Sequence, residues 1–278
     1  MTASPAAPDP ETLRGLQERV AKANPAEHVE HLGQWWLRRS AGPSWWTATV
    51  LPHGETDAAE LAARIAAAER FYAEAGTPAR FQISPGACAA ELDAVLAARG
   101  YRASGAVSLR AAVTEEVRAL RAPEGPPAQV REDPSAAWFA AWRTVHGHGG
   151  DPGTERDMLE RVRQPSAYAS VLDGSEVIAV GRAVAEAGWA GVFGMATLPK
   201  ARGRGAARAV LCSLADWAGT HAAPRMYLQV ESGNQAAVRL YERLGFAELC
   251  RYHYRTEPGA AESSNRGQDA VSRSNCRS

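Results

Sequence analysis

The chain has 278 residues, of which 45% are hydrophobic and 22% charged, and its 31 basic residues equal its 31 acidic ones. This length fits one large or two ordinary domains, and the balanced charge gives no attraction to nucleic acid or to a membrane surface. There is no signal-like start and no run near the roughly 18 apolar residues of a membrane span, so we expect a cytoplasmic globular protein. Its four cysteines lack paired or metal-ligand spacing, which predicts reduced thiols: Cys88, Cys212, Cys250 and Cys276.

Composition divides the chain into two folded parts. Residues 1–10 are rich in Pro and Ala, and residues 257–278 are polar with almost nothing to bury, so we expect both ends to be disordered. The proline-rich stretch 121–128 cannot continue a helix and predicts a linker. The folded parts are then residues 11–120 and 129–256.

Hydrophobic periodicity and turn residues predict alternating strands and helices in both parts. The predicted elements of the first part are strands at 34–39 and 45–50, a helix at 58–75, a strand at 80–83, a helix at 91–98 and a strand at 106–110. The second part begins with a strand at 129–132, helices at 135–145 and 155–162, and strands at 168–172 and 177–184 joined by a turn at Asp173-Gly174.

The most informative segment runs from Met195 to Leu211, where a strand passes through a glycine-rich turn into an amphipathic helix. The unpaired amides and the dipole of a helix N-terminus hold a phosphate without a dedicated side chain. Gly203 and Gly205 allow close approach, and Arg202 and Arg204 add positive charge. Because the segment has neither a Gly-Lys-Ser/Thr ending nor a dinucleotide fingerprint, it predicts an anion site of another kind.

A second motif follows about 30 residues later. Residues 227–231 alternate as a strand, Asn234 closes a turn with helix-capping chemistry, and apolar residues then recur at helical spacing until Gly245. The two motifs together resemble those of the GCN5-related N-acetyltransferase (GNAT) family. The resemblance is carried by Arg202, Gly205, Ala207, Asn234, Leu240, Tyr241, Gly245 and Phe246.

The resemblance implies an α/β (α+β) fold, with a mixed, mostly antiparallel sheet flanked by helices, and an acyltransferase that uses acetyl-CoA as co-substrate. It implies that Tyr241 protonates the CoA thiolate, although an aromatic ring packed under the sheet is the alternative. It also implies that a backbone amide of Met195 or Ala196 stabilises the oxyanion. The residues implied to contact the cofactor are Met195, Ala196, Thr197, Leu198, Arg202, Gly203, Arg204, Gly205, Ala206, Ala207 and Asn234.

The first part repeats the second in weakened form. Residues 81–101 match residues 228–246 with an offset of about 145 to 147 positions, which indicates an internal duplication. The counterpart of the phosphate loop, residues 50–57, has one glycine, two acids and no arginine, and would repel a pyrophosphate. We therefore expect tandem GNAT-like domains, with residues 11–120 a degenerate scaffold or substrate-side wall and residues 129–256 the catalytic domain.

Several residues are candidates for the general base. His146 lies in a glycine-rich loop where the family often builds its acceptor site, while Glu186 and Glu231 lie near the ends of predicted strands. His146 and His148 also allow a metal interpretation, but a third ligand at suitable spacing is missing, so we expect no metal. Deprotonation of the amine through water is the remaining alternative.

The acceptor is the least constrained part of the reaction. The acidic run of Asp151, Glu155 and Asp157 would suit a polycationic aminoglycoside, yet it also suits an ordinary helix N-terminus. A fused second half tends to close the acceptor cleft, so we expect a small-molecule primary amine. The alternatives are a protein lysine or N-terminus as acceptor, and a protein that binds acyl-CoA as a sensor without turnover.

Overall fold

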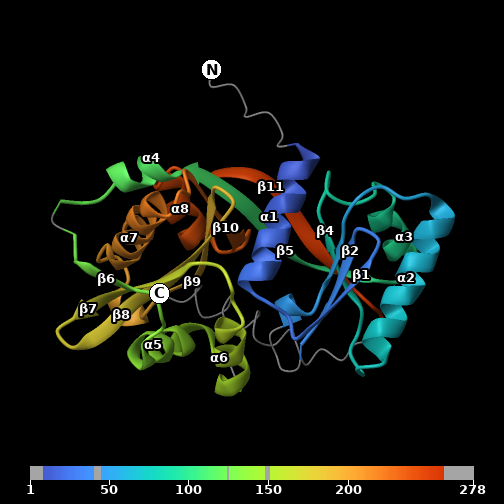
Figure 1. Ribbon diagram of the computed structural model, residues 1–278, viewed down its shortest axis with the longest axis horizontal. Coiled ribbons are helices and arrows are strands. Elements are labelled where there is room, and N and C mark those ends of the chain that lie inside the picture. Colours follow the sequence, from blue (N-terminus) through green and yellow to red (C-terminus); the bar gives the residue numbers. More distant parts are fainter. Residues whose placement is uncertain (1–8, 41–44, 124, 148–150, 260–278) are drawn as a thin grey trace.

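The computed structural model describes residues 9–40, 45–123, 125–147 and 151–259. Within these residues the strands form one eleven-stranded mixed sheet, flanked by helices (Figure 1). In sheet order the strands are β1 (His28–Leu32), β2 (Trp35–Arg39), β3 (Val50–Pro52), β4 (Arg80–Ile83), β11 (Ala247–Thr256), β5 (Arg102–Val113), β10 (Arg225–Glu231), β9 (Trp189–Thr197), β8 (Glu176–Glu186), β7 (Ser166–Asp173) and β6 (Ala128–Arg131).

The helices connect these strands in chain order. They are α1 (Pro10–Ala23), α2 (Ala58–Ala73), α3 (Leu92–Ala98), α4 (Thr114–Ala119), α5 (Ala136–His146), α6 (Pro152–Glu160), α7 (Ala206–Thr220) and α8 (Gln235–Arg243), with two short 3-10 helices, η1 (Trp45–Thr47) and η2 (Pro199–Ala201). No helix in the described ranges combines the length and the apolarity that a bilayer crossing requires.

The centre of the sheet alternates strands from the two halves of the sequence. β5 lies between β10 and β11, and β11 lies between β4 and β5, with antiparallel pairing throughout this group. Each half therefore inserts its last strand into the sheet of the other half, as the green and red ribbons crossing in Figure 1 show. Among the described strands, parallel pairing is found between β3 and β4 and between β9 and β10, which are equivalent positions in the two halves. The expected α/β class is confirmed.

Strand alternation distributes the side chains of the sheet between several cores. On β10, Met226 and Leu228 belong to the core under α7, whereas Tyr227 between them packs on the other face with Leu13 and Leu16 of α1. Helices α5 and α6 contribute to a third core, and α2 and α3 cover the first half of the sheet. Helix α1 thus crosses the junction of the two halves (Figure 1).

The continuous sheet predicts that the two halves unfold together. Ile65 of α2 and Leu211 of α7 are both fully buried, in separate cores. Replacing either with Ala is expected to cost about 2 to 5 kcal/mol. In thermal unfolding followed by circular dichroism, both variants should lower the midpoint of one shared transition. Two transitions, each shifted by one variant alone, would contradict this prediction.

The structure corrects the predicted strand at 45–50. Trp45–Thr47 forms the 3-10 helix η1 instead, and pairing with β2 begins at Val50. The physical reason is the buried side chain of Arg38, which donates to the carbonyl oxygens of Thr49 (3.2 Å) and Trp46 (3.3 Å) and so draws this backbone away from the ladder. Three further elements, α1, β1 and α4, have no counterpart among the predicted ones.

The ends of the chain are partly outside the described residues. The two segments expected to be disordered are residues 1–10 and 257–278. Of these, residues 1–8 and 260–278 lie outside the described part of the chain. Of the remainder, Asp9 caps α1 by accepting a hydrogen bond from the backbone N of Thr12 (2.8 Å), and Pro10 begins the helix. Glu257 continues the pairing of β11 through a 3.0 Å bond from its backbone N to Ala79 O.

Candidate active site

The parallel pair β9 and β10 separates halfway along its length. Their ladder joins residues 225–228 to residues 189–192 and stops at Leu228 and Val192. Beyond this point β9 pairs only with β8, and β10 pairs only with β5. We call the diverging residues, 193–197 of β9 and 229–231 of β10, the fork. Because these inner edges share no ladder, the backbone groups along them that no other residue binds can pair with a bound molecule.

A β-bulge shapes the β9 side of the fork. The register between β8 and β9 shifts between Val180 and Arg182, opposite Gly194, which has φ +61°. A Cβ at Gly194 would lie 3.0 Å from the indole nitrogen of Trp142. The next residue, Met195, directs its carbonyl oxygen to His146 Nε2 at 3.1 Å. The bulge therefore connects β9 to the exposed imidazole of His146 at the end of α5.

The bulge predicts a selective effect of a methyl group at Gly194. Gly194→Ala forces an L-residue into positive φ, at about 1 to 2 kcal/mol, and moves Trp142. Gly188→Ala is the matched control, because Gly188 also has a positive φ (+79°) but open space around it. Both variants should lose stability, and only Gly194→Ala should weaken binding of acetyl-CoA, the ligand that the family resemblance implies, in calorimetry. Equal binding by both variants would show that the bulge does not shape the site.

The glycine-rich turn ends in an open helix N-terminus. Residues 202–205 are all exposed, and Gly203 and Gly205 have φ +75° and +78°. Gly205 is the N-cap of α7 and supplies no side-chain hydrogen bond, and the first backbone bond of the helix runs from Ala209 N to Gly205 O. The amides before Ala209 have no acceptor within the helix, so this end presents donors and partial positive charge to solvent.

Two arginines flank this turn in different ways. Arg204 forms an exposed ion pair with Asp173 of the β7–β8 turn (2.8 Å). Such a pair contributes little stability, so its guanidinium can exchange one anion for another. Arg208, by contrast, donates from Nε to Leu120 O (2.7 Å) and ties α7 to the segment before the linker. Lys200 pairs with Glu176 at 2.5 Å.

In the first half, the helix end equivalent to the N-terminus of α7 is the N-terminus of α2, and it is already occupied by a side chain. Helix α2 is capped by Asp57, whose carboxylate accepts from Glu60 N at 2.8 Å, so an internal anion occupies that helix end. Beside it, Gly54 N donates to Ala87 O (3.0 Å), and Gly54 forms a bridge with Cys88. The chain itself therefore takes up the backbone groups next to the β3–β4 pair.

Tyr241 lies near the end of α8 and is 7% exposed, in the core shared with α7. Burial raises the pKa of its phenol to about 12. Its ring meets that of Phe246 edge-on, with 6.0 Å between centroids, and its hydroxyl has no hydrogen-bond partner among the described residues. The structure thus places the Tyr241 ring in a packed aromatic contact and leaves its hydroxyl without a bond to another described residue.

The other candidate residues have identifiable local partners. Asn234 is the N-cap of α8, and its side-chain oxygen accepts from Ala237 N at 3.1 Å. Asp151 caps α6 by accepting from the amides of Gly153 and Thr154, both at 3.2 Å. Glu186 binds Lys22 of α1 at 2.6 Å. These contacts give each residue a structural role, whatever it does in catalysis.

Glu155, within the acidic run, is 5% exposed and lies 3.3 Å from Arg143 Nε, and its burial raises the pKa of its carboxyl group. His148 lies outside the described residues. In the described part of the chain, no three His, Cys, Asp or Glu side chains gather in a way that could hold a metal ion. The three cysteines described there, Cys88, Cys212 and Cys250, are unpaired.

Comparisons with known proteins show which fold this forked sheet with its uncapped helix N-terminus resembles. Residues 128–246 match the model of the acetyltransferase (GNAT) family. Over that segment, which holds the fork and the open N-terminus of α7, the chain is similar to this family of acetyltransferases.

Full-length relatives cover both halves of the chain. An uncharacterized N-acetyltransferase of Bacillus subtilis (strain 168), YobR, is 25% identical over 249 residues, 87% of this chain and 98% of its own. Among solved structures, a GCN5-related N-acetyltransferase from Kribbella flavida has a TM-score of 0.71 and 17% identity over 91% of this chain and 96% of its own. A tandem GNAT protein from the clavulanic acid biosynthesis pathway has a TM-score of 0.62 and 12% identity, covering 92% and 90%.

Proposed function

We propose that this protein transfers the acetyl group of acetyl-CoA to a primary amine of a small molecule. The observation that carries the proposal is the fork of β9 and β10 beside the open N-terminus of α7. The fork offers unpaired backbone edges to an amide-containing chain, and the N-terminus of α7 offers amide donors to a pyrophosphate. In CoA, an amide-containing pantetheine arm is followed by a pyrophosphate, so the molecule matches the fork and the helix N-terminus in the same order.

The cofactor would then lie along the second half of the fold. Residues 203–207 hold the pyrophosphate through backbone amides, with Arg202 and Arg204 adding charge. Residues 195–197 pair with the pantetheine amides along the free edge of β9. Leu198, whose amide and carbonyl already bond to Ile178 O and Ala201 N (both 2.9 Å), borders the cofactor, as does Asn234 at the start of α8. Since Asp57 and the bridge at Gly54 fill the equivalent place in the first half, we assign that half, residues 11–120, the role of a scaffold.

The reaction needs three groups around the thioester. The amine nitrogen attacks the thioester carbon, and a backbone amide at Met195 or Ala196 donates to the oxyanion. The amine loses its proton to His146 or to water, and the C–S bond breaks as Tyr241 gives its proton to the sulfur. The Tyr241 phenol carries its proton at neutral pH, and burial raises its pKa further, to about 12. Solvent then returns the proton to Tyr241.

A small acceptor is supported by the position of α1. Arg182 of β8 donates to Ala23 O at the end of this helix (2.7 Å), and Arg19 donates to Glu186 O (3.2 Å). These contacts hold α1 against the sheet face opposite α7, beside the fork. Helix α1 therefore covers the sheet face beside the fork, which favours a small amine over a folded protein as the acceptor.

Release of free CoA from acetyl-CoA, measured with a panel of amines, tests the proposed function. The panel should include polyamines, amino sugars, aminoglycosides, amino acids and lysine peptides. We expect release that depends on a small amine and falls in the His146→Ala variant but not in His221→Ala, an exposed histidine of another surface. Tight acetyl-CoA binding without release would identify a sensor, and release with peptides alone would identify a protein acceptor.

A further inference from the structure

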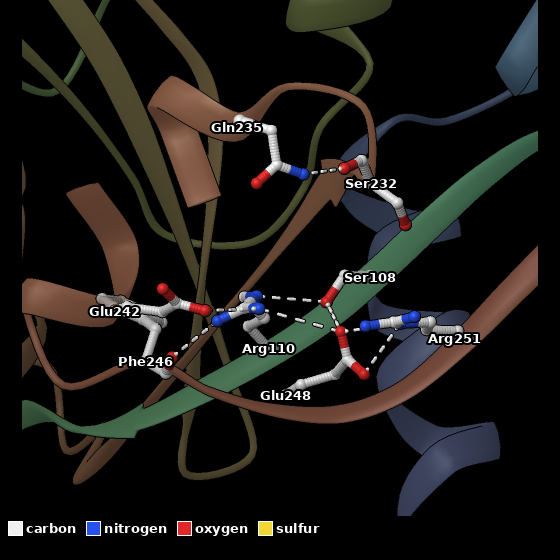
Figure 2. A network of polar contacts seen from close by, with 8 residues as sticks. All are labelled: Ser108, Arg110, Ser232, Gln235, Glu242, Phe246, Glu248 and Arg251. Atoms are coloured by element: carbon white, nitrogen blue, oxygen red, sulfur yellow. Dashed lines mark hydrogen bonds and ion pairs between the residues drawn. The ribbon is translucent and has the colours of Figure 1, made fainter. Parts of the chain in front are cut away.

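Each exchanged strand carries one arginine that reaches into the opposite half. Arg110 of β5 donates from Nη1 to Phe246 O (3.1 Å) and from Nη2 to Glu242 Oε1 (3.1 Å), as Figure 2 shows. Arg255 of β11 donates from Nη1 to Tyr101 O (3.2 Å) and from Nε to Asp93 (2.7 Å). Both guanidiniums bind the carbonyl of an aromatic residue and a carboxylate of the helix that precedes it.

The two arginines are equivalent in the sequence repeat. Arg110 follows Tyr101 by nine positions, and Arg255 follows Phe246 by nine. The helix ends they hold are also alike. Gly100 and Gly245 have φ +81° and +84°. The amide of the next residue donates back into the helix in each half, Tyr101 N to Leu96 O (3.0 Å) and Phe246 N to Tyr241 O (2.9 Å).

The two halves differ in the residue whose backbone carbonyl accepts this last hydrogen bond. In the first half it is Leu96, which is fully buried and has no titratable group. In the second half it is Tyr241, which contacts Phe246 both through this backbone bond and through its ring. Arg110 therefore fixes Phe246, and Phe246 fixes both the backbone and the ring of Tyr241.

The surroundings of Arg110 support a fixed geometry. The residue is 6% exposed, and its Nε donates to Ser108 Oγ (3.1 Å), which in turn donates to Glu248 (2.8 Å). Glu248 also binds Arg251, which closes the network in Figure 2. All three guanidinium nitrogens of Arg110 are thus engaged, and a buried arginine held in this way has one orientation.

We propose that Arg110, supplied by the first half, is a positioning residue for the phenol of Tyr241. The degenerate half thereby contributes to acetyl transfer without touching substrate. This inference rests on the proposed function, in which Tyr241 is the general acid. Because small displacements of a catalytic group cost up to about 100-fold in rate, loss of the contact is expected to slow the chemical step.

A double-mutant cycle tests the proposal with a matched control. Arg110→Gln is expected to lower kcat roughly tenfold and leave the Kd for acetyl-CoA unchanged. Arg255→Gln removes the equivalent contact in the other half, so it should lower Tm similarly and leave kcat within about twofold. In a Tyr241→Phe background, Arg110→Gln should cost no further rate. Arg110→Lys keeps one donor to Phe246 O and should recover part of kcat. It also replaces Arg110→Gln in the test if that variant does not fold.

Two outcomes would overturn the inference alone. One is that Arg110→Gln slows the Tyr241→Phe enzyme as much as the wild type, and the other is that Arg255→Gln lowers kcat as much as Arg110→Gln does. A Tyr241→Phe enzyme with wild-type kcat would instead overturn the acid role in the proposed function, and the inference with it. Each failure is therefore recognisable from the same set of variants.

Discussion

Replacing Gly205 with Asp is expected to raise the Kd for acetyl-CoA by at least about 100-fold. The variant adds a carboxylate at the N-terminus of α7, where the first half already has one, because Asp57 bonds to the first turn of α2 at 2.8 Å. A carboxylate at Gly205 would lie beside the amides proposed for the pyrophosphate and repel it, at about 4 kcal/mol for two unit charges 4 Å apart near a surface. Isothermal titration calorimetry of the purified variant with acetyl-CoA measures the effect.

Gly76→Asp is the control for this experiment. Gly76 has φ +64° and, like Gly205, open space where a Cβ would go, but it follows α2 in the first half. The two variants therefore share the added charge and the backbone strain, and they differ in the helix end they affect. If Gly205→Asp keeps wild-type affinity while folded, the pyrophosphate is bound elsewhere.

Tyr241→Phe is expected to lower kcat about 100-fold and to change the Kd for acetyl-CoA less than about twofold, since a general acid acts in the transition state. The pKa of Tyr241, about 12, adds a prediction for pH. A general acid works in its protonated form. Tyr241 is therefore active below its pKa, and its activity is lost only as the pH rises through that pKa. Tyr241 should therefore cause no decline in kcat up to about pH 10.

Steady-state kinetics from pH 6 to pH 10 check both parts of this prediction. Tyr227→Phe is the control, because Tyr227 is another fully buried tyrosine, on the sheet face that packs against α1. We expect it to change stability without a comparable loss of kcat. A decline between pH 8 and pH 10 that disappears in Tyr241→Phe would contradict the raised pKa of this phenol.

Local sequence signals predicted most of the second half because its elements are long and its turns carry distinctive residues. The glycines at 203 and 205 have a left-handed φ, as their place in a glycine-rich turn predicted, and Asn234 caps the helix that its type and position predicted. These features depend on residues close together in the sequence. Such features are the ones that periodicity and capping rules describe.

Two of the features that sequence analysis missed depend on side-chain contacts from outside their own segments. The strand predicted at 45–50 failed because the side chain of Arg38 competes for its carbonyl groups, and no local pattern shows that competition. The sequence does not distinguish Arg110 from other strand residues, since Phe246, whose carbonyl it binds, follows 136 positions later. The repeated spacing from Tyr101 to Arg110 and from Phe246 to Arg255 was the available signal.

The exchange of β5 and β11 also sets an order for folding during synthesis. The first half needs β11 between β4 and β5 to complete its sheet, and β11 ends at Thr256. A ribosome releases the chain from its N-terminus, so residues 11–120 emerge with a vacant strand position between β4 and β5. That position is filled only when almost the whole described chain has left the exit tunnel. The N-terminal half, although made first, therefore completes its fold last.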